Sequence, residues 1–373
     1  MLTYISTPKT ILPAYSTNSH QFTVYDVSIA ADSNLYYSMF VYITGQSDPV
    51  IIEQPKNENN QAVFNIGGIL QGYFNSTIYN HTALSLDTSI LSYYVSVKGF
   101  GSNSSYYTYR DSSIHYVFNG VENYTTFDVS SYCFTPSKVS NFLTTWSSER
   151  DIHYADNTYL QFLSGKFRNI DSSFNGLTVT RYQINGDSSL RNIILTKDTS
   201  AKIVSLNVCP STLNNSIGST FIDSSTTYYT IKEKSGLSNT YKFNILPVDT
   251  RFPRYYRIFY VGSLGATEAF NFDLTAENVI NIDKQYYTNN SIKKVFGTTI
   301  EDTYTISCNW ISEEMSINLK ELWGTPEAQL VEGFTLVPII ITEKSKQILN
   351  VPVRLINYTL SYIRSDDYKI QKN

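Results

Sequence analysis

Short runs of aromatic and β-branched residues, separated by turn-forming residues, recur along most of the chain. Such runs are typical of half-buried β-strands, because branched and aromatic side chains pack well on a pleated surface. In the first third of the chain, residues 45–49 carry the turn chemistry of a hairpin between two of these runs. The strands predicted for this part are residues 22–29, 36–43, 50–52, 62–66, 69–70, 93–97 and 115–118.

The pattern loosens between residues 125 and 165, where hydrophobic pairs flank the polar and charged stretch 147–151. Few-contact connections between domains have this kind of composition, so we place a connection here. Strand patterns then resume. The strands predicted beyond it are residues 177–184, 193–195, 203–208, 226–231, 241–246, 255–261, 334–341 and 351–362.

Residues 312–323 have the period of a helix instead. Ser312 is a favourable N-cap, and Gly324 provides a C-terminal stop. The apolar residues of this segment fall on one helical face: Met315, Leu319 and Leu322.

These patterns predict a mainly β protein with two β-sandwich-like, immunoglobulin-like domains and one short helix in the second. The 373 residues exceed the usual span of a single hydrophobic core. No fixed repeat of about 20 to 50 residues emerges, which disfavours a solenoid or propeller. The predicted organisation is an N-terminal domain at 1–124, a connecting segment at 125–165, a C-terminal β-rich domain at 166–364 and a polar tail at 365–373.

The composition narrows the classes of partner. The chain has 31 Tyr and 20 Phe but only 16% charged residues, with a net charge of −4. That balance provides no broad basic field, so we expect no sequence-specific nucleic acid partner. No apolar stretch of about 18 residues occurs, and the first residues lack the basic and apolar regions of a leader, so we expect no membrane anchor and synthesis in a cytosol.

Cysteine and histidine spacing gives no metal motif. The three cysteines are far apart and form no CxxC pair, so we expect buried free thiols. The four histidines are scattered, and we expect structural or surface roles for them. These residues are Cys133, Cys209 and Cys308, and His20, His81, His115 and His153.

The nearest approach to a ligand cluster is Asp151, His153 and Asp156, whose side chains would converge if the segment turned sharply. Charged residues are seldom buried without partners, so we expect solvated loop residues here instead.

Catalytic patterns are also missing. Residues 262–267 lack the spacing and the lysine of a phosphate-binding loop, and predict a turn between two aromatic strands. The adjacent acid pairs Glu313/Glu314 and Asp366/Asp367 point apart on a helix or strand, so neither forms a glycosidase dyad. We therefore predict no catalytic, cofactor-binding or metal-binding residue, no cofactor and no enzymatic activity.

Aromatic side chains leave one binding alternative open. Trp146, Trp310 and Trp323 would stack on sugar rings if they were exposed, because a flat apolar face suits carbohydrate. Core packing is the interpretation we favour for all three.

Residues 254–272, RYYRIFYVGSLGATEAFNF, combine a strand, a small Leu-Gly turn and an aromatic strand. Together with residues 310–323, residues 337–341 and the region 43–71, this passage resembles virion proteins of tailed phages that infect Bacteroidota. Within that group the chain resembles the tail-ring proteins of crAss-like phages.

The resemblance implies a structural subunit with immunoglobulin-like domains, in a ring of the virion tail below the portal. The implied assembly is a cyclic homo-oligomer, with twelve copies as the implied number, which contacts other tail or portal-vertex proteins. Such a ring helps to form the channel for DNA and ejected proteins. It implies synthesis in the host bacterial cytoplasm and no catalytic residue.

Two other functions stay open from the sequence. The aromatic surplus suits a virion spike or receptor-binding module that recognises host-surface glycan. An enzyme acting on capsule polysaccharide would need carboxylates that meet across distant strands.

Overall fold

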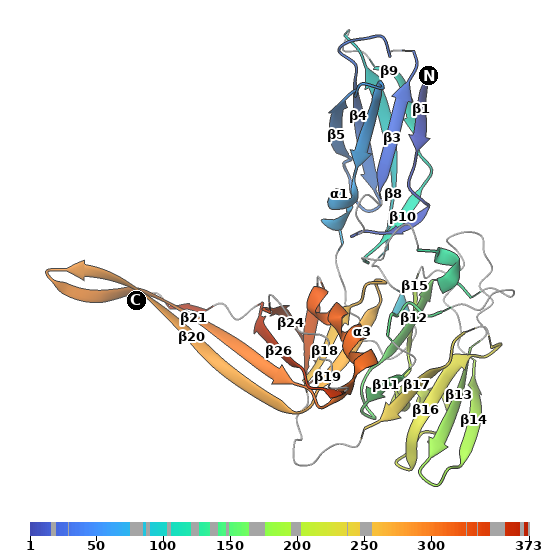
Figure 1. The fold of residues 1–373 in the computed structure, drawn as a ribbon, viewed down its shortest axis with the longest axis vertical. Coiled ribbons are helices and arrows are strands. Elements are labelled where there is room, and N and C mark those ends of the chain that lie inside the picture. The colour runs from blue at the N-terminus through green and yellow to red at the C-terminus, as the bar shows by residue number, and fades with distance from the viewer. Residues whose placement is uncertain are drawn as a thin grey trace.

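The chain folds into β-sheets almost throughout in the computed structural model, which confirms the prediction of a mainly β protein. An upright N-terminal body stands on a wider C-terminal part, from which a long hairpin projects sideways (Figure 1). The structure describes residues 1–15, 20–28, 30–74, 85–86, 90–102, 106–120, 127–134, 141–146, 149–163, 176–194, 203–236, 238–246, 256–325, 327–333, 335–343, 355–365 and 369–371.

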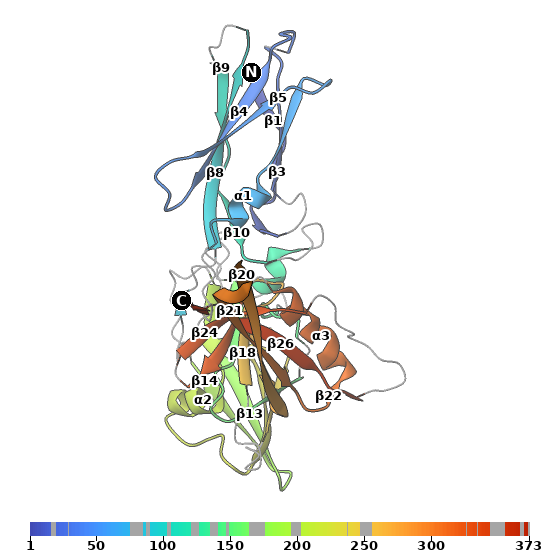
Figure 2. The same ribbon diagram turned by 90° about the vertical axis from the view of Figure 1, so that its left-hand side faces the viewer.

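Two sheets face each other in the N-terminal body and form an immunoglobulin-like β-sandwich (Figure 2). One sheet has the order β1-β3-β6, and the other has the order β2-β10-β8-β4-β5, with β9 added on β8. The strands of the first sheet are β1 (Leu2–Ser6), β3 (Gln21–Asp26) and β6 (Gln61–Asn65). Those of the second are β2 (Ile11–Pro13), β4 (Tyr36–Ile43), β5 (Val50–Pro55), β8 (Ile90–Phe100), β9 (Tyr106–Asp111) and β10 (His115–Phe118).

Strand β4 shows why this sequence forms a sandwich. Its residues Tyr37, Met39 and Val41 are fully buried in the core between the sheets. On the other face, Tyr42 stacks on Tyr94 of the neighbouring strand with ring centroids 4.7 Å apart. Such cross-strand pairs stabilise a sheet on its outer face, which accounts for part of the tyrosine surplus.

One predicted strand of this body is wrong. Residues 69–70 lie in the short helix α1 (Gly67–Gln71), and Leu70 is buried in the sandwich core. A pair of adjacent apolar residues does not distinguish a helical turn from a strand.

A second sandwich follows, with one large core of its own. Its sheets have the orders β11-β17-β16-β13-β14 and β12-β15-β7. The strands are β7 (Ser85–Leu86), β11 (Glu149–Ile152), β12 (Tyr159–Leu163), β13 (Leu177–Gln183), β14 (Ser188–Ile193), β15 (Ile203–Asn207), β16 (Thr226–Glu233) and β17 (Tyr241–Ile245).

The segment 125–165 is more than the connection that its composition suggests. It contains a 3₁₀ turn, η1 (Val129–Tyr132), and it supplies β11, which pairs in parallel with β17, and β12, which pairs with β15. Every residue of β12 is buried. Phe134 and Phe142 of this segment also lie in the core of the second sandwich.

Helix α2 (Pro210–Ile217) was not predicted, so the C-terminal part has a second helix besides the expected one. Its start and end signals are present in the sequence. Pro210 occupies the first turn, and Gly218 ends the helix in the left-handed conformation with φ 74°.

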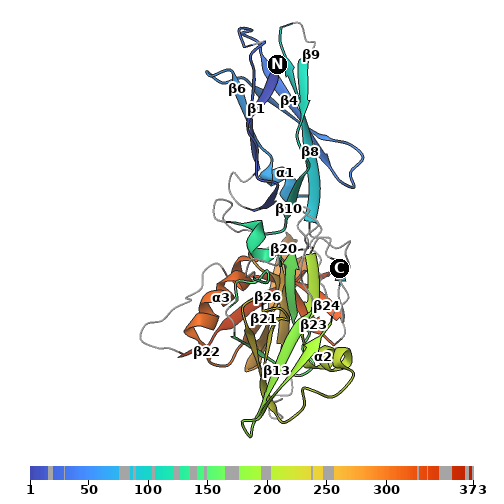
Figure 3. The same cartoon turned by 90° about the vertical axis from the view of Figure 1, so that its right-hand side faces the viewer.

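The last part of the chain is an eight-stranded sheet with helix α3 on it (Figure 3). The order is β19-β18-β23-β24-β26-β21-β20, with β27 added on β21. These elements are β18 (Tyr256–Val261), β19 (Thr267–Phe272), β20 (Thr275–Asn289), β21 (Ile292–Ser307), α3 (Glu313–Gly324), β23 (Ala328–Glu332), β24 (Thr335–Ile341), β26 (Thr359–Arg364) and β27 (Lys369–Gln371), with the small pair β22 (Ile311–Ser312) and β25 (Leu355–Ile356) beside them.

The helix predicted at 312–323 is confirmed as α3. The Ser312 hydroxyl accepts a hydrogen bond from the backbone N–H of Met315, at 3.2 Å, as an N-cap does. Leu319 and Leu322 are fully buried against the sheet. The predicted domain 166–364 therefore holds parts of two large cores, one in the second sandwich and one under α3.

The polar tail predicted at 365–373 is not free along its length. Residues Lys369–Gln371 form β27, which pairs antiparallel with residues 298–300 of β21. Strand β27 therefore lies along the projecting hairpin.

Two buried ion pairs join the second sandwich to the last sheet. Arg150 of β11 donates to Glu268 of β19 at 3.0 Å, and Arg257 of β18 donates to Asp156 at 3.2 Å. Burial raises the pKa of Glu268 to about 7 against the opposing effect of the Arg150 charge. Charges this deep are compatible with folding only when they are paired and hydrogen-bonded.

The N-terminal sandwich packs directly on the turn between β18 and β19. A Cβ added at Gly265 would lie 2.7 Å from the carbonyl oxygen of Asn119, and one at Gly120 would lie 2.7 Å from that of Ser263. Gly265 also has a φ of +74°. Only glycine permits both this backbone conformation and so close an approach.

Acid should destabilise the N-terminal sandwich through His20. Its Nδ1 lies 2.9 Å from the Tyr93 hydroxyl and its Nε2 lies 3.1 Å from the Pro13 carbonyl oxygen, both in the core. Burial, together with the neighbouring His115, lowers the pKa of His20 to about 4 against the opposing effect of its hydrogen bond to Pro13. A base with a depressed folded pKa stabilises the fold above its unfolded pKa, and this stability is lost as the pH falls.

We therefore expect the free energy of unfolding of this sandwich to fall by about 3 kcal/mol between pH 6.5 and pH 4, measured by urea denaturation. The variant His20→Gln cannot titrate and should show a much weaker pH dependence over that range. Equal pH dependence in the variant and the natural chain would contradict the assignment.

Candidate assembly surface

The hairpin β20-β21 projects far from the rest of the chain, and we call residues 275–307 the arm (Figure 1). Its two strands pair antiparallel along their whole length. Fifteen strand residues at about 3.3 Å each make the arm about 50 Å long. Asn290 and Ser291 close it as a two-residue turn, with φ of 50° and 63°, as a type I′ hairpin requires.

Apolar residues gather on one face of the arm, although Asp302 lies opposite Ile280 on the same face. In an antiparallel pair, residues that lie directly opposite share a face. The register therefore places Ile280, Ile282 and Tyr286 on one face with Ile300 and Val295 of the other strand. Ile280 and Ile282 are more than half exposed, at 56% and 57%. Contiguous exposed apolar residues mark interaction sites more often than inert surface, whereas single scattered ones do not.

This apolar face continues the core of the last sheet. On the same face of β21, Ile306 is buried under α3, and Tyr304 stacks on Tyr362 of β26 with ring centroids 5.3 Å apart. Beyond Tyr304 no other described element covers the apolar side chains of β20. The apolar face that is buried under α3 at the base of the arm thus continues along the arm as exposed apolar side chains.

The outer edge of β20 is also uncovered by any strand that the structure describes, since β20 ends the order of its sheet. All fifteen of its residues are exposed. A long exposed edge presents unpaired N–H and C=O groups, and natural proteins normally cover or interrupt such an edge.

The end of the arm is basic. We call residues 284–296 the arm tip, and this stretch contains Lys284, Lys293 and Lys294 but no acidic residue. The Lys293 ammonium lies 4.2 Å from the centroid of the Tyr286 ring, within cation–π distance. Tyr287 and Phe296 contact each other edge to face, with centroids 6.2 Å apart.

A hollow of about 180 Å³ lies where the arm leaves the sheet, and we call it the base hollow. Its apolar wall includes Phe270 and Met315, and Trp310 beside it is 61% exposed. Asp151 and Asp273 add two carboxylates to its lining. Residues of β11, β19, β22 and α3 meet here, so the hollow lies at the seam between the second sandwich and the last sheet.

The electrostatics of the base hollow favour a cation. Burial raises the pKa of Asp151, and the charges of Glu149 and Asp273 raise it further, while a hydrogen bond from Asn244 and the charge of Lys242 lower it. Glu149 is itself neutralised by Lys242 at 2.9 Å. Asp151 is exposed and Asp273 is half-buried. Among the described residues no cation forms an ion pair with either carboxylate, and a ligand cation would relieve their repulsion.

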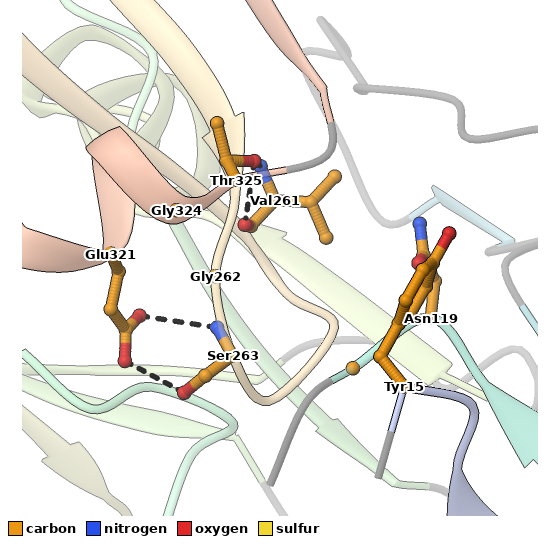
Figure 4. Close-up of a pocket in the computed structure, with 9 residues that line it drawn as sticks. Tyr15, Asn119, Val261, Gly262, Ser263, Glu321, Gly324 and Thr325 are labelled. Carbon is orange, nitrogen blue, oxygen red and sulfur yellow. Dashed lines mark hydrogen bonds between the residues drawn. The ribbon is translucent and has the colours of Figure 1, made fainter. Parts of the chain in front are cut away.

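A smaller hollow of about 80 Å³ lies at the joint between the N-terminal sandwich and the last sheet (Figure 4). Tyr15 and Asn119 flank it on one side, and the turn after β18 flanks it on the other. The carboxylate of Glu321 accepts hydrogen bonds from the backbone N–H and the hydroxyl of Ser263, at 3.1 and 2.7 Å. These bonds hold α3 on the turn, so this hollow belongs to the joint.

The prediction of a solvated cluster at Asp151, His153 and Asp156 is wrong in part. His153 and Asp156 are buried, at 5% and 3% exposure. The Asp156 carboxylate accepts from the His153 N–H, from Asn271 and from Arg257. Within the described part of the chain, no three His, Cys, Asp or Glu side chains gather as they do around a metal ion.

The tryptophans divide between the two interpretations. Trp146 is buried and donates from Nε1 to the Tyr260 hydroxyl at 2.7 Å, and Trp323 packs on Tyr358. Core packing is therefore confirmed for these two and wrong for Trp310, which lies at the base hollow.

The remaining sequence predictions concern a turn, the cysteines, the histidines and two acid pairs. The turn predicted between aromatic strands is confirmed, since β18 and β19 form a hairpin around residues 262–266. All three cysteines are buried free thiols, as expected, and His20 and His115 lie in the N-terminal core. Glu313 and Glu314 are neighbours in the first turn of α3. His81, Asp366 and Asp367 lie outside the described residues.

Comparison with known proteins identifies no family for this chain. No family model matches the chain, and no curated protein matches it. Among solved structures, the chain is similar to "Crystal structure of chicken CNTN1 FN1-FN3 domains" with 11% identity, a TM-score of 0.17 and coverage of 62% of each chain. The chain thus spans less than two thirds of that one, and a likeness this weak carries no argument.

Among the helices that the structure describes, none is both long enough and apolar enough to cross a lipid bilayer.

Proposed function

We propose that this chain is a structural subunit that assembles with copies of itself, as a ring subunit in the tail of a phage virion. In this role it helps to form the channel for DNA and ejected proteins below the portal, and it contacts other tail or portal-vertex proteins. The sequence resemblance to tail-ring proteins of crAss-like phages supports the phage setting. The arm is the observation that carries the assembly role.

The arm is large enough for a specific interface. A two-stranded ribbon about 50 Å long and about 10 Å wide offers roughly 500 Å² on one face. Its open edge and tip add to that area, which brings the arm near the roughly 800 Å² per partner of a standard protein interface. An isolated hairpin of two strands is only marginally stable in water, so a partner surface would also stabilise the arm itself.

The direction of the arm favours a closed or helical array. An arm that leaves one side of a subunit and contacts a different surface of the next makes a heterologous contact. Contacts of this kind close into a ring when the rotation between subunits permits it. A structural rather than catalytic role agrees with the absence of a catalytic motif in the sequence.

The purified full chain should form discrete assemblies whose mass is a multiple of the chain mass, measured by native mass spectrometry and sedimentation. Negative-stain images should show rings, and mass spectrometry of purified phage particles should detect the chain. A monomer at every accessible concentration, together with its absence from particles, would overturn the proposal.

A second candidate is a virion spike or receptor-binding module for host-surface glycan, and the exposed Trp310 beside the base hollow favours it. A sugar ring would stack on the indole while its hydroxyls donate to carboxylates. Binding on a glycan array that is lost in Trp310→Ala would support this function, and a uniformly negative array would discard it.

A further inference from the structure

The base hollow has the chemistry of a lysine-binding site. A lysine side chain joins an aliphatic stem to an ammonium group, so it suits a cleft with apolar walls and an anionic end. Phe270 and Met315 provide such walls, and Asp151 and Asp273 provide the anionic end. The exposed indole of Trp310 adds a face on which a cation is attracted.

The arm tip carries the matching groups. Its three lysines have no acidic residue between them in the sequence, and Lys293 and Lys294 are exposed beside the turn. The tip therefore carries three positive charges, which are complementary in sign to the two carboxylates of the base hollow. Complementary charges of this kind set the register and the rate of association between proteins.

One chain cannot make this contact with itself. The arm begins at Thr275, directly after Asp273 and Leu274, so the base hollow lies at its root. The tip is about 50 Å from that root along a continuously paired ribbon. The hollow and the tip of the same chain are therefore held apart by the arm that connects them.

We propose that the arm tip of one copy binds in the base hollow of a second copy. This inference rests on the proposed function and names the contact by which the copies assemble. Each chain has one tip and one hollow, so the contact repeats from head to tail and places successive arms end to end around the assembly. The apolar face of each arm then lies along the neighbour that its tip has reached.

Reversing the charge of the tip should abolish this contact. In Lys293→Glu/Lys294→Glu the tip would face Asp151 and Asp273 with like charge, and self-association should weaken by well over tenfold, so that the variant stays monomeric at concentrations at which the natural chain assembles. The matched control is Lys232→Glu/Lys234→Glu, which makes the same change at two exposed lysines of β16 and the turn after it. The control should assemble as the natural chain does.

The hollow is tested by Trp310→Ala/Asp273→Asn, which removes the exposed indole and one charge. This variant should also stay monomeric, while its circular dichroism and melting temperature show that it is folded. Added salt should weaken the assembly of the natural chain, since exposed charge pairs are screened.

Mixing the two assembly-deficient variants gives the sharpest test. The variant Lys293→Glu/Lys294→Glu retains an intact base hollow, and Trp310→Ala/Asp273→Asn retains an intact arm tip. One productive contact therefore remains possible between them. Their mixture should form a 1:1 dimer with twice the mass of one chain, and nothing larger, by native mass spectrometry.

The outcomes separate this contact from the function on which it rests. If the mixture stays monomeric, or if either variant assembles normally, while the natural chain assembles, the tip-to-hollow contact is refuted and the assembly role stands. If the natural chain never assembles, the proposed function fails and this contact fails with it.

Discussion

The variant Asp156→Ala should lose about 3–5 kcal/mol of its free energy of unfolding, as the removal of one partner from a buried ion pair does. Arg257 is only 6% exposed, and Asp156 accepts its Nη1 donor at 3.2 Å. Without Asp156 the guanidinium stays buried without its counter-charge. Asn271 Nδ2 and the His153 N–H lose their acceptor in the same change. Urea denaturation followed by circular dichroism measures the loss.

The exposed ion pair between Lys242 and Glu149 is the matched control. Its nitrogen-oxygen distance is 2.9 Å, but its side chains are 36% and 51% exposed. The variant Lys242→Ala should therefore cost less than about 1 kcal/mol. The double variant Asp156→Leu/Arg257→Met removes both buried charges, and it should be more stable than Asp156→Ala alone. A loss below that of Lys242→Ala would show that Asp156 does not compensate Arg257.

The buried charges also show why local sequence could not find this site. Carboxylates are mostly solvated, so a short stretch with Asp151, His153 and Asp156 is best interpreted as a surface loop. The partner that permits burial is Arg257, which lies 101 residues further along the chain. Only the pairing of β18 and β19 beside this loop brings the two charges together, and nothing in the spacing of one segment predicts it.

Strands with one buried face were predicted well for the same physical reason. Burial on alternate residues produces a period of two that is visible locally, as in β4 and β16. Helix α3 was equally visible, because its cap, its apolar face and its stop agree. The arm gives no such pattern, since both of its faces are exposed and Val279 stands next to Ile280 on the opposite face.

The arm was therefore missed, although one signal for it exists. Residues 275–307 contain a long polar and β-branched stretch with an Asn-Asn-Ser-Ile turn at its centre. Asn is among the residues that tolerate the left-handed conformation at such turns, but the pair Asn-Ser is a weaker hairpin signal than Asn-Gly. The base hollow could not be predicted at all, because its walls come from four separate segments.

Shortening the arm should abolish assembly while the rest of the chain stays folded. Asn278 lies directly opposite Tyr304, so deletion of residues 279–303 and insertion of Asn-Gly would close a short hairpin in the natural register. Ile306 and its partner Leu360 on β26 remain, and the core under α3 stays intact. We expect a monomer at every concentration by sedimentation, with a melting temperature close to that of the full chain.

Two point variants identify which face of the arm assembles. Ile282 and Val279 are similarly exposed, at 57% and 53%, but they lie on opposite faces of β20. Since only the face of Ile282 continues the core of the sheet, Ile282→Glu should weaken assembly strongly and Val279→Glu should weaken it little. Equal losses of assembly would mean that the neighbouring copy contacts both faces of the arm. Full assembly of the shortened chain would mean that the exposed apolar face serves another partner.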